Sequence, residues 1–171
     1  GWQRAISNKR SSNWSFINSG FNLRPTDISA SIGNSQIKKL KNIIKIRQKN
    51  FNLIRNALLS NEKYSNKFYI VKENPKNSIV WFGVPIILKS KDKNYKNRVT
   101  KKLNSFGIDT RPLISGNFAN QPAVKLYNLK IKNDLKNADY IDKNSFFIGL
   151  HNTKTNVKII NFIKKALYAS L

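Results

Sequence analysis

The stretch from Gly20 to Leu40 reads GFNLRPTDISASIGNSQIKKL and contains the clearest helix start in the chain. Thr26 can accept a hydrogen bond from an exposed backbone N–H, and the charge of Asp27 suits the positive end of a helix. The sequence therefore predicts a helix from Asp27 to about Lys39. The apolar residues on one side of this helix are Ile28, Ile32 and Leu40.

Downstream of this stretch, the apolar pattern predicts a compact α+β unit. We expect helices at 42–59, 94–106 and 138–143 and a last helix capped by Thr155, and strands at 68–71, 79–88, 108–111 and 146–150. The continuous apolar run 79–88 indicates a strand that is buried on both faces. The inward positions predicted for the last helix are Val157, Ile160, Ile163 and Leu167. The order is helix–helix followed by a β-β-α-β-(α)-β-α unit.

The net charge of +24 comes from 32 Lys and Arg against 8 Asp and Glu in 171 residues. Such a charge favours a nucleic acid or another anionic partner. The chain, however, holds 25 Lys, 25 Asn and 21 Ile, all encoded by A- and T-rich codons, and only 7 Arg. The basic residues are scattered and form no block of five or more. A lysine-rich solvated surface explains the charge, and a basic nucleic-acid-binding module remains the alternative.

The rarer residue types exclude several kinds of site. The chain has no Cys, which excludes disulfides, zinc–thiolate centres and a cysteine nucleophile, and its single His argues against a multi-histidine metal site. The longest apolar run has ten residues, well short of the ~20 that a membrane helix needs. No set of nucleophile, histidine and acid can be assembled, so we predict no catalytic residue and no metal ligand within this chain.

Two loops and one histidine are candidates for binding. The loop 20–26 places an amide and an arginine, Asn22 and Arg24, just before a helix N-terminus, which suits an anion. The loop 110–122 places Arg111 and Asn117 around a glycine turn. His151 follows a predicted strand and is either a structural residue or part of a site. Spacing alone leaves ordinary loops as the alternative in both cases.

The motifs together resemble the sugar aminotransferase and dehydratase family of PLP-dependent fold type I enzymes, named DegT/DnrJ/EryC1/StrS. That family shows Gly-Tyr-Asn, a spacer, Thr-Glu or Thr-Asp, and a small-residue helix that ends in Gln-Leu. The segments 20–40, 81–83, 111–122 and 137–151 and the final helix follow in the same order, so the resemblance spans nearly the whole chain. The departures are Phe21 for Tyr and Ile37 for Leu. Within the family, the segments GNF (116–118) and FFIGLH (146–151) most resemble the corresponding segments of sugar 3-dehydratases of the GDP-4-keto-6-deoxymannose type.

The resemblance implies a particular place in a larger enzyme. Residues 1–60 are expected to be the tail of the large domain and its connecting helices, with the dimer crossover loop at 20–26. Residues 61–171 are expected to form the small C-terminal α+β domain, with helices on a small, mostly antiparallel sheet. The Schiff-base residue, a Lys or in some 3-dehydratases a His, would precede the segment that begins at Gly1. This chain is therefore expected to lack it.

The resemblance also implies roles for the candidate residues. Asn22 would hydrogen-bond the PLP phosphate of the other subunit of a homodimer, and Arg24 would lie near the substrate phosphates. Arg111 and Asn117 would line the pocket for a nucleotide sugar, which His151 would border. The implied enzyme is a cytoplasmic 3-dehydratase or aminotransferase of surface polysaccharide (lipopolysaccharide) biosynthesis. Dehydration is favoured over amination, and the alternatives are a nucleic-acid-binding module or a catalytically empty interaction domain.

Overall fold

The computed structural model describes residues 3–4, 16–18, 26–72, 76–113, 116–121, 124 and 130–171. The chain divides into two compact units, residues 1–41 and 42–171, which we describe separately. In the first unit, β1 (Gln3–Arg4) pairs with β2 (Phe16–Asn18) in antiparallel fashion, and α1 spans Asp27–Ile37. The division of a whole enzyme at residue 60 stays a prediction.

The start of α1 confirms the predicted cap. The Thr26 hydroxyl accepts a hydrogen bond from the Ser29 N–H at 3.2 Å, and Asp27 occupies the first turn. The apolar side of the helix, however, is open: Ile28 is 74% exposed and Ile32 is 59% exposed. None of the eleven residues of α1 is buried within the described chain.

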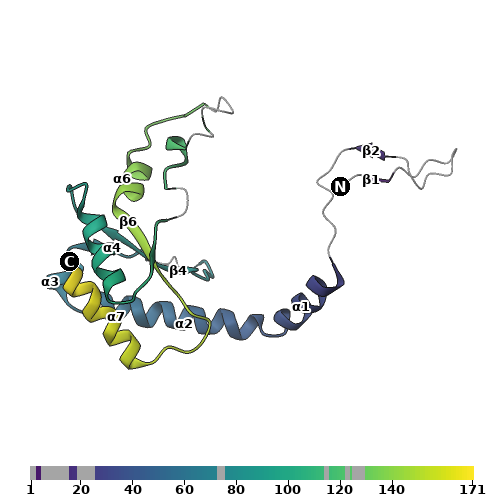
Figure 1. Cartoon of the computed structure of the whole chain (residues 1–171), viewed down its shortest axis with the longest axis horizontal. Helices are drawn as coiled ribbons and strands as arrows, with labels where there is room; N and C mark the ends of the chain where they lie inside the picture. Colours follow the sequence, from purple (N-terminus) through teal and green to yellow (C-terminus); the bar gives the residue numbers. More distant parts are fainter. Residues whose placement is uncertain are drawn as a thin grey trace. The chain divides into compact units, whose positions relative to one another are not determined.

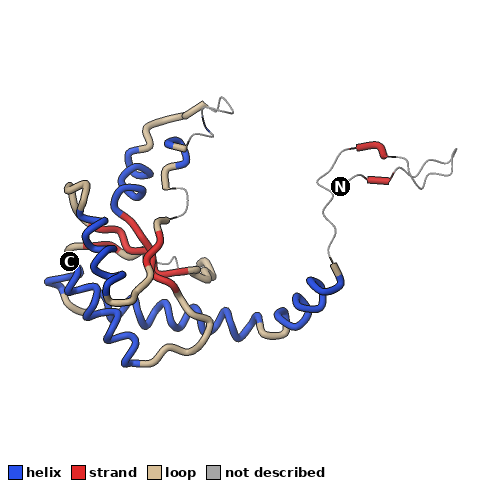
Figure 2. Tube along the Cα trace, viewed as in Figure 1, coloured by secondary structure: helices blue, strands red, loops and turns tan. Residues whose placement is uncertain are grey.

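The second unit contains the four-stranded sheet (Figures 1 and 2). Its elements are α2 (Leu40–Leu59), α3 (Glu62–Ser65), β3 (Phe68–Tyr69), β4 (Gly83–Leu88), α4 (Tyr95–Ser105), β5 (Thr110–Arg111), the 3₁₀ turn η1 (Phe118–Asn120), α6 (Lys136–Asn144), β6 (Ser145–Gly149) and α7 (Val157–Ser170). The strand order is β3-β4-β6-β5, and every neighbouring pair is antiparallel. The predicted α+β class and order of elements are confirmed.

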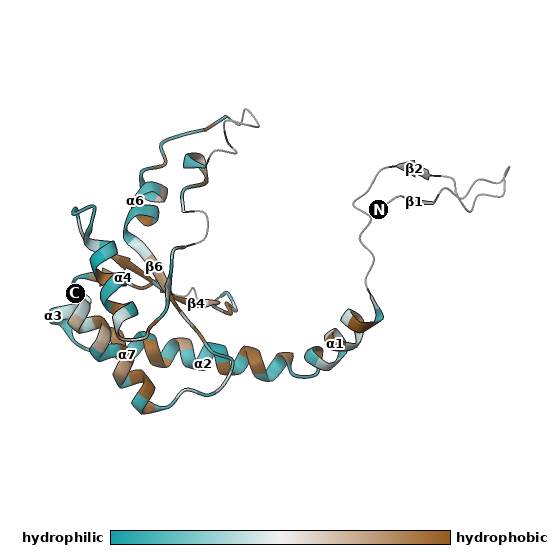
Figure 3. Cartoon of the chain, viewed as in Figure 1, coloured by the Kyte–Doolittle hydropathy of each residue, from teal (hydrophilic) through white to brown (hydrophobic). Residues whose placement is uncertain are grey.

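One face of the sheet carries the core. Val84 pairs with Ile148 and Ile86 pairs with Phe146, so these side chains point to the same face. The buried positions of α2, α4 and α7 belong to the same core cluster, and they are Phe51, Ile54, Leu58, Val99, Leu103, Ile160, Ala166 and Leu167. Figure 3 shows α2 banded in brown and teal, as expected of an amphipathic helix. Helices therefore cover this face.

The predicted strand 79–88 begins four residues later than expected. The Gln48 amide donates to the carbonyl of Ile79 at 3.2 Å, and the Arg47 guanidinium donates to the carbonyls of Trp81 and Phe82 at 2.8 Å each. These carbonyls are satisfied by side chains of α2 instead of a neighbouring strand. The ladder starts at Gly83, and Phe82 is 66% exposed. Apolar character alone did not reveal that boundary.

The last helix differs from the prediction at its first turn. Asn156, not Thr155, is the N-cap, since its side-chain oxygen accepts from the Ile159 N–H at 2.9 Å. Val157 was predicted to point inward but is 70% exposed, because it lies in the turn before the helix reaches the core. Ile160 and Leu167 are buried, as predicted. Among the described helices, none has the length and apolar character needed to cross a bilayer.

Candidate functional site

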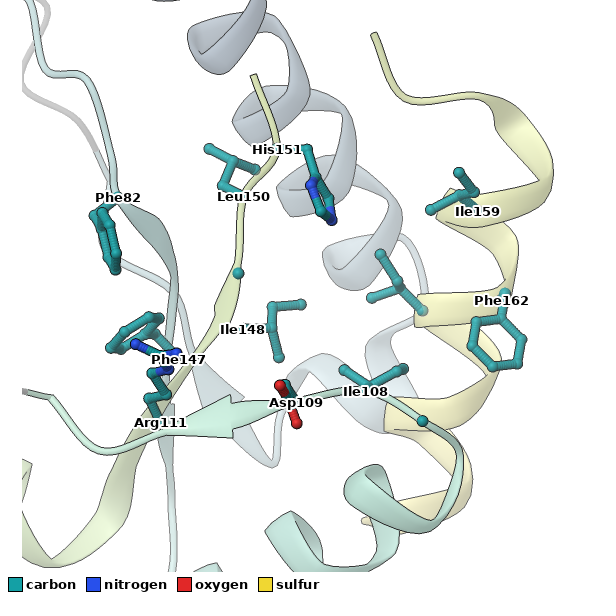
Figure 4. Close-up of a pocket in the computed structure, with 13 residues that line it drawn as sticks. Phe82, Ile108, Asp109, Arg111, Phe147, Ile148, Leu150, His151, Ile159 and Phe162 are labelled. Atoms are coloured by element: carbon teal, nitrogen blue, oxygen red, sulfur yellow. The ribbon is translucent and has the colours of Figure 1, made fainter. Parts of the chain in front are cut away.

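A cavity of about 570 Å³ lies where β6 ends, between the β5–β6 edge and α7 (Figure 4). Its lining residues come from the start of β4, the segment before and in β5, the end of β6 and the first half of α7. They are Phe82, Gly107, Ile108, Asp109, Arg111, Phe147, Ile148, Gly149, Leu150, His151, Ile159, Phe162 and Ile163. Arg111 and His151, two of the predicted substrate residues, thus line one cavity.

The first wall of the cavity is aromatic and cationic. The rings of Phe82 and Phe147 meet edge to face with their centroids 5.6 Å apart. Arg111 lies directly opposite Phe147 in the β5–β6 ladder, so the two side chains share a face, and Figure 4 shows them side by side. Arg111 is exposed and always charged, so it can bind a phosphate in bidentate fashion.

The second wall is mostly apolar. In Figure 4, Ile148 and His151 point toward α7, where Ile159 and Phe162 complete the wall. Ile159 is 47% exposed and Phe162 is 49% exposed. His151 is exposed and lies just after the sheet, at the start of the loop that leads to α7. Its imidazole is a donor and an acceptor beside an apolar surface, an arrangement that suits a ligand with both ring and polar groups.

Two glycines pair in the β4–β6 ladder, Gly83 of β4 and Gly149 of β6, and the second of them lines the cavity. A Cβ added at Gly83 would lie 2.4 Å from the Phe147 ring and 2.6 Å from the Ile148 carbonyl oxygen. A Cβ at Gly149 would meet nothing within 4 Å. Gly83 therefore permits the close packing of Phe147, whereas at Gly149 the space beside the backbone is open.

Asn117 lies elsewhere and is occupied by local contacts. It is 5% exposed, accepts from the Ala119 N–H at 3.1 Å and donates to the Asp139 carboxylate at 2.8 Å. Asn120 donates to the same carboxylate at 2.9 Å. The hydrogen bonds from Asn117 and then Asn120 hold the pKa of Asp139 below its usual value. Asn117 is not among the residues that line the cavity, and its role in substrate binding remains a prediction.

The other predicted residues and groups can be placed only in part. Asn22 and Arg24 lie outside the described residues. The described lining of the cavity contains Arg111, His151 and Asp109 as its charged or titratable side chains and includes no lysine. In the described part of the chain, no three His, Cys, Asp or Glu side chains gather as a metal site would require.

Sequence reasoning missed the two phenylalanines of the first wall. The sequence predicts Phe82 within a buried strand and Phe147 within the strand 146–150. Their contact depends on the pairing of β4 with β6, which lie about 60 residues apart in the sequence. The adjacent glycines, Gly83 and Gly149, were the available signal, because a glycine within a strand often marks a close approach.

Comparisons with known proteins agree along most of the chain. A family model described as the DegT/DnrJ/EryC1/StrS aminotransferase family matches residues 3–165. A GDP-4-keto-6-deoxy-D-mannose 3-dehydratase of Yersinia pseudotuberculosis is 34% identical over 154 residues, 88% of this chain and 38% of the relative. The lipopolysaccharide biosynthesis protein RfbH of Salmonella typhimurium is 28% identical over 138 residues, 81% of this chain and 31% of the relative.

Solved structures show the same similarity. The structure of an E. coli GDP-4-keto-6-deoxy-D-mannose-3-dehydratase with bound hydrated PLP matches with a TM-score of 0.78 and 31% identity. The match covers 94% of this chain and 40% of that chain. This chain therefore spans about two fifths of the length of such relatives, and its fold corresponds to that part of a fold type I PLP enzyme.

Proposed function

Because the chain belongs to the DegT/DnrJ/EryC1/StrS aminotransferase family, we propose that it is the C-terminal part of a PLP-dependent enzyme that modifies a nucleotide-activated keto-deoxy sugar. The observation that carries this proposal is the 34% identity to a GDP-sugar 3-dehydratase over 88% of the chain. The Salmonella relative supports a place in surface polysaccharide biosynthesis. We further propose that the enzyme acts in the cytoplasm, the compartment in which nucleotide sugars serve as substrates.

In this proposal the cavity beside β6 binds part of the nucleotide sugar. The Arg111 guanidinium binds a phosphate oxygen pair, and the Phe82–Phe147 pair beside it excludes water from that contact. His151 borders the sugar and offers a hydrogen bond. Arg24 adds a second cation near the diphosphate, and Asn117 holds the loop 116–121 in place through Ala119 and Asp139.

The cofactor is held mainly by the rest of the enzyme. PLP, when bound, supplies the electron sink for chemistry at the sugar carbons. From this chain, Asn22 would donate a hydrogen bond to the PLP phosphate of the partner subunit in a homodimer. The Schiff-base residue is proposed to lie in the part of the enzyme that precedes the segment at Gly1, as the family resemblance implies. This chain alone is therefore proposed to bind no PLP covalently.

We propose that the reaction is removal of the C3 hydroxyl of a 4-keto-6-deoxy sugar, not amination at C4. The support is the similarity to two 3-dehydratases, at 34% and 31% identity. The deciding group lies outside this chain, at the cofactor position. A lysine there favours full transamination, whereas a histidine leaves proton transfer and elimination.

The test uses the complete reading frame with PLP, glutamate and GDP-4-keto-6-deoxymannose. We expect loss of the C3 oxygen, measured by mass spectrometry of the sugar nucleotide. Accumulation of a stable amino sugar that retains this oxygen would reject dehydration and support the aminotransferase. If the enzyme neither dehydrates nor aminates any nucleotide sugar, the proposed function as a whole is rejected.

Arg111 allows a sharper test of the cavity itself. Arg111→Gln removes one charge-assisted contact and should raise KM by roughly tenfold or more, which corresponds to about 1.4 kcal/mol. Lys101→Gln, an exposed residue of α4 with the same change in charge, is the control. Equal effects of the two variants would mean that Arg111 acts only through the general basic field.

A further inference from the structure

One side chain of the helix α2, that of Arg47, contacts the backbone just before β4 and just after β6, beside the cavity. The Arg47 guanidinium donates to the Trp81 carbonyl from Nε and Nη2 at 3.2 and 2.8 Å, and to the Phe82 carbonyl at 2.8 Å. Its Nη1 donates to the Leu150 carbonyl at 3.0 Å. A single planar cation thus joins the start of β4 to the end of β6.

A second side chain follows on the same side of α2. Asn50, three residues after Arg47, is 3% exposed. Its Nδ2 donates to the carbonyls of His151 and Thr153 at 3.1 and 2.7 Å, and its Oδ1 accepts from the Thr155 N–H at 3.2 Å. Both the nitrogen and the oxygen of the Asn50 amide therefore form hydrogen bonds, and these hold the backbone of the loop that begins at His151.

These contacts reach both walls of the cavity. The Arg47 guanidinium carbon lies 5.9 Å from the centroid of the Phe82 ring, which in turn packs on Phe147. The carbonyl of His151 is held directly by Asn50, and the preceding carbonyl is held by Arg47. Neither Arg47 nor Asn50 lines the cavity. Both therefore act on it through Phe82 and His151.

We propose that Arg47 and Asn50 are positioning residues, which set the separation between Phe82 on one wall and His151 on the other. The proposal rests on the proposed function only for the identity of the ligand. Because two elements that are distant in sequence are tied to one rigid helix, the cavity is shaped before a ligand arrives. Such preorganisation lowers the cost of binding.

Two conservative variants separate positioning from simple stabilisation. Arg47→Lys keeps the charge but loses the planar fork that reaches three carbonyls. Asn50→Asp keeps the oxygen that accepts from Thr155 but loses both donations to the loop. Lys49→Gln, an exposed residue of the same helix, is the matched control. Urea denaturation identifies the variants that are folded and can be compared.

The first measurement uses this chain itself. His151 is the only histidine in the sequence, so its ring resonances in a proton–carbon NMR spectrum need no assignment. We expect Arg47→Lys and Asn50→Asp to shift and broaden the His151 signal, and to raise amide exchange at 151–155 by roughly tenfold relative to the control. An unchanged His151 signal in both folded variants would overturn the proposal, whatever their stability.

The second measurement uses the complete enzyme. We expect each variant to raise KM for the nucleotide sugar by roughly tenfold, with a smaller change in kcat. Lys49→Gln should change neither constant. A lowered stability with an unchanged KM would show a purely structural role and overturn the proposal. If the unmodified enzyme turns over no nucleotide sugar, the proposed function fails, and the NMR result still decides the positioning role.

Discussion

Two successive helices carry apolar stripes of similar spacing, yet only one buries its stripe within the described chain. In α2, Phe51 and Leu58 are 0% exposed and Ile54 is 4% exposed. In α1, no residue is buried, and Ile28 is 74% exposed. The difference teaches that an apolar stripe indicates a helix that needs a partner, but does not reveal where the partner is.

The small residues of α1 suit close packing against another backbone. A Cβ added at Gly33 would meet nothing within 4 Å, so no described contact requires a glycine there. Ala30 and Gly33 would permit close approach of another backbone, which agrees with the proposed dimer. The dimer itself stays a proposal, and the predictions below test the contrast between the two helices.

The largest expected effect is in α2. Phe51→Ala should lower the free energy of unfolding by roughly 3–5 kcal/mol, since it removes a fully buried ring that stacks on Trp81 at 5.3 Å. Urea denaturation measures the loss. Ile28→Ala in α1 should change it by less than about 0.5 kcal/mol. If the two variants lower the free energy of unfolding by similar amounts, α1 and α2 do not differ in burial as described.

The next effect should appear only in the complete enzyme. Ile32→Asp in α1 should weaken the proposed dimer by roughly 1.5–3 kcal/mol, because an apolar contact is replaced by a charge. Sedimentation equilibrium measures the dissociation constant. Asn34→Asp, which introduces the same charge on another side of α1, is the control. A dimer unchanged by Ile32→Asp would place the partner of α1 elsewhere.

The helix caps give a smaller contrast. Asn156→Ala should destabilise the second unit by about 1 kcal/mol, because α7 carries the buried Ile160 and Leu167. Thr26→Ala removes an equivalent cap, but should reduce only the helicity of α1, measured by circular dichroism. Thr155→Ala should have little effect on unfolding. A larger loss for Thr155→Ala than for Asn156→Ala would contradict the observed cap.

The mildest effect concerns a segment held by polar contacts. Hydrogen bonds from Asn117 and Asn120 lower the pKa of Asp139 from its ordinary 3.8. Their stabilisation is therefore present above that value and lost as the pH falls through the lower pKa of the folded state. Amide exchange at 119–121 should rise over that acid range, and Asp139→Asn should abolish the dependence. A rise that persists in Asp139→Asn would assign it to another group.

Much of the fold could be predicted because local and global preferences agree. The Thr26 cap and the Asp27 in the first turn of α1 follow from the residue types at those positions. The start of β4 could not be predicted, since it depends on long-range contacts from Arg47 and Gln48. Asn156 and Thr155 are both good caps, and only the packing of α7 selects between them.

The candidate site was predictable in part for a similar reason. Arg111 and His151 stood out by residue type and by resemblance, and both line the cavity. Phe147 alternates with the core residues Phe146 and Ile148, and Phe82 lies before the ladder begins, so neither belongs to the core cluster. Their apolar character alone does not reveal this. The contacts of Asn117 with Asp139 join two segments whose proximity no local pattern encodes.

The strand order β3-β4-β6-β5 has a consequence for how the chain folds as it is synthesised. β6, which follows the other described strands in the sequence, lies between β4 and β5 and is the ladder partner of both. While the ribosome is still making residues 112–144, β5 lacks β6, its one partner in the described sheet, and β4 can pair only with β3. The sheet can be completed only after Ser145 to Gly149 emerge, and the cavity at its edge only after α7 has followed. Long-range pairing of this kind is slow, and it leaves the apolar edge of β4 exposed to other nascent chains until then.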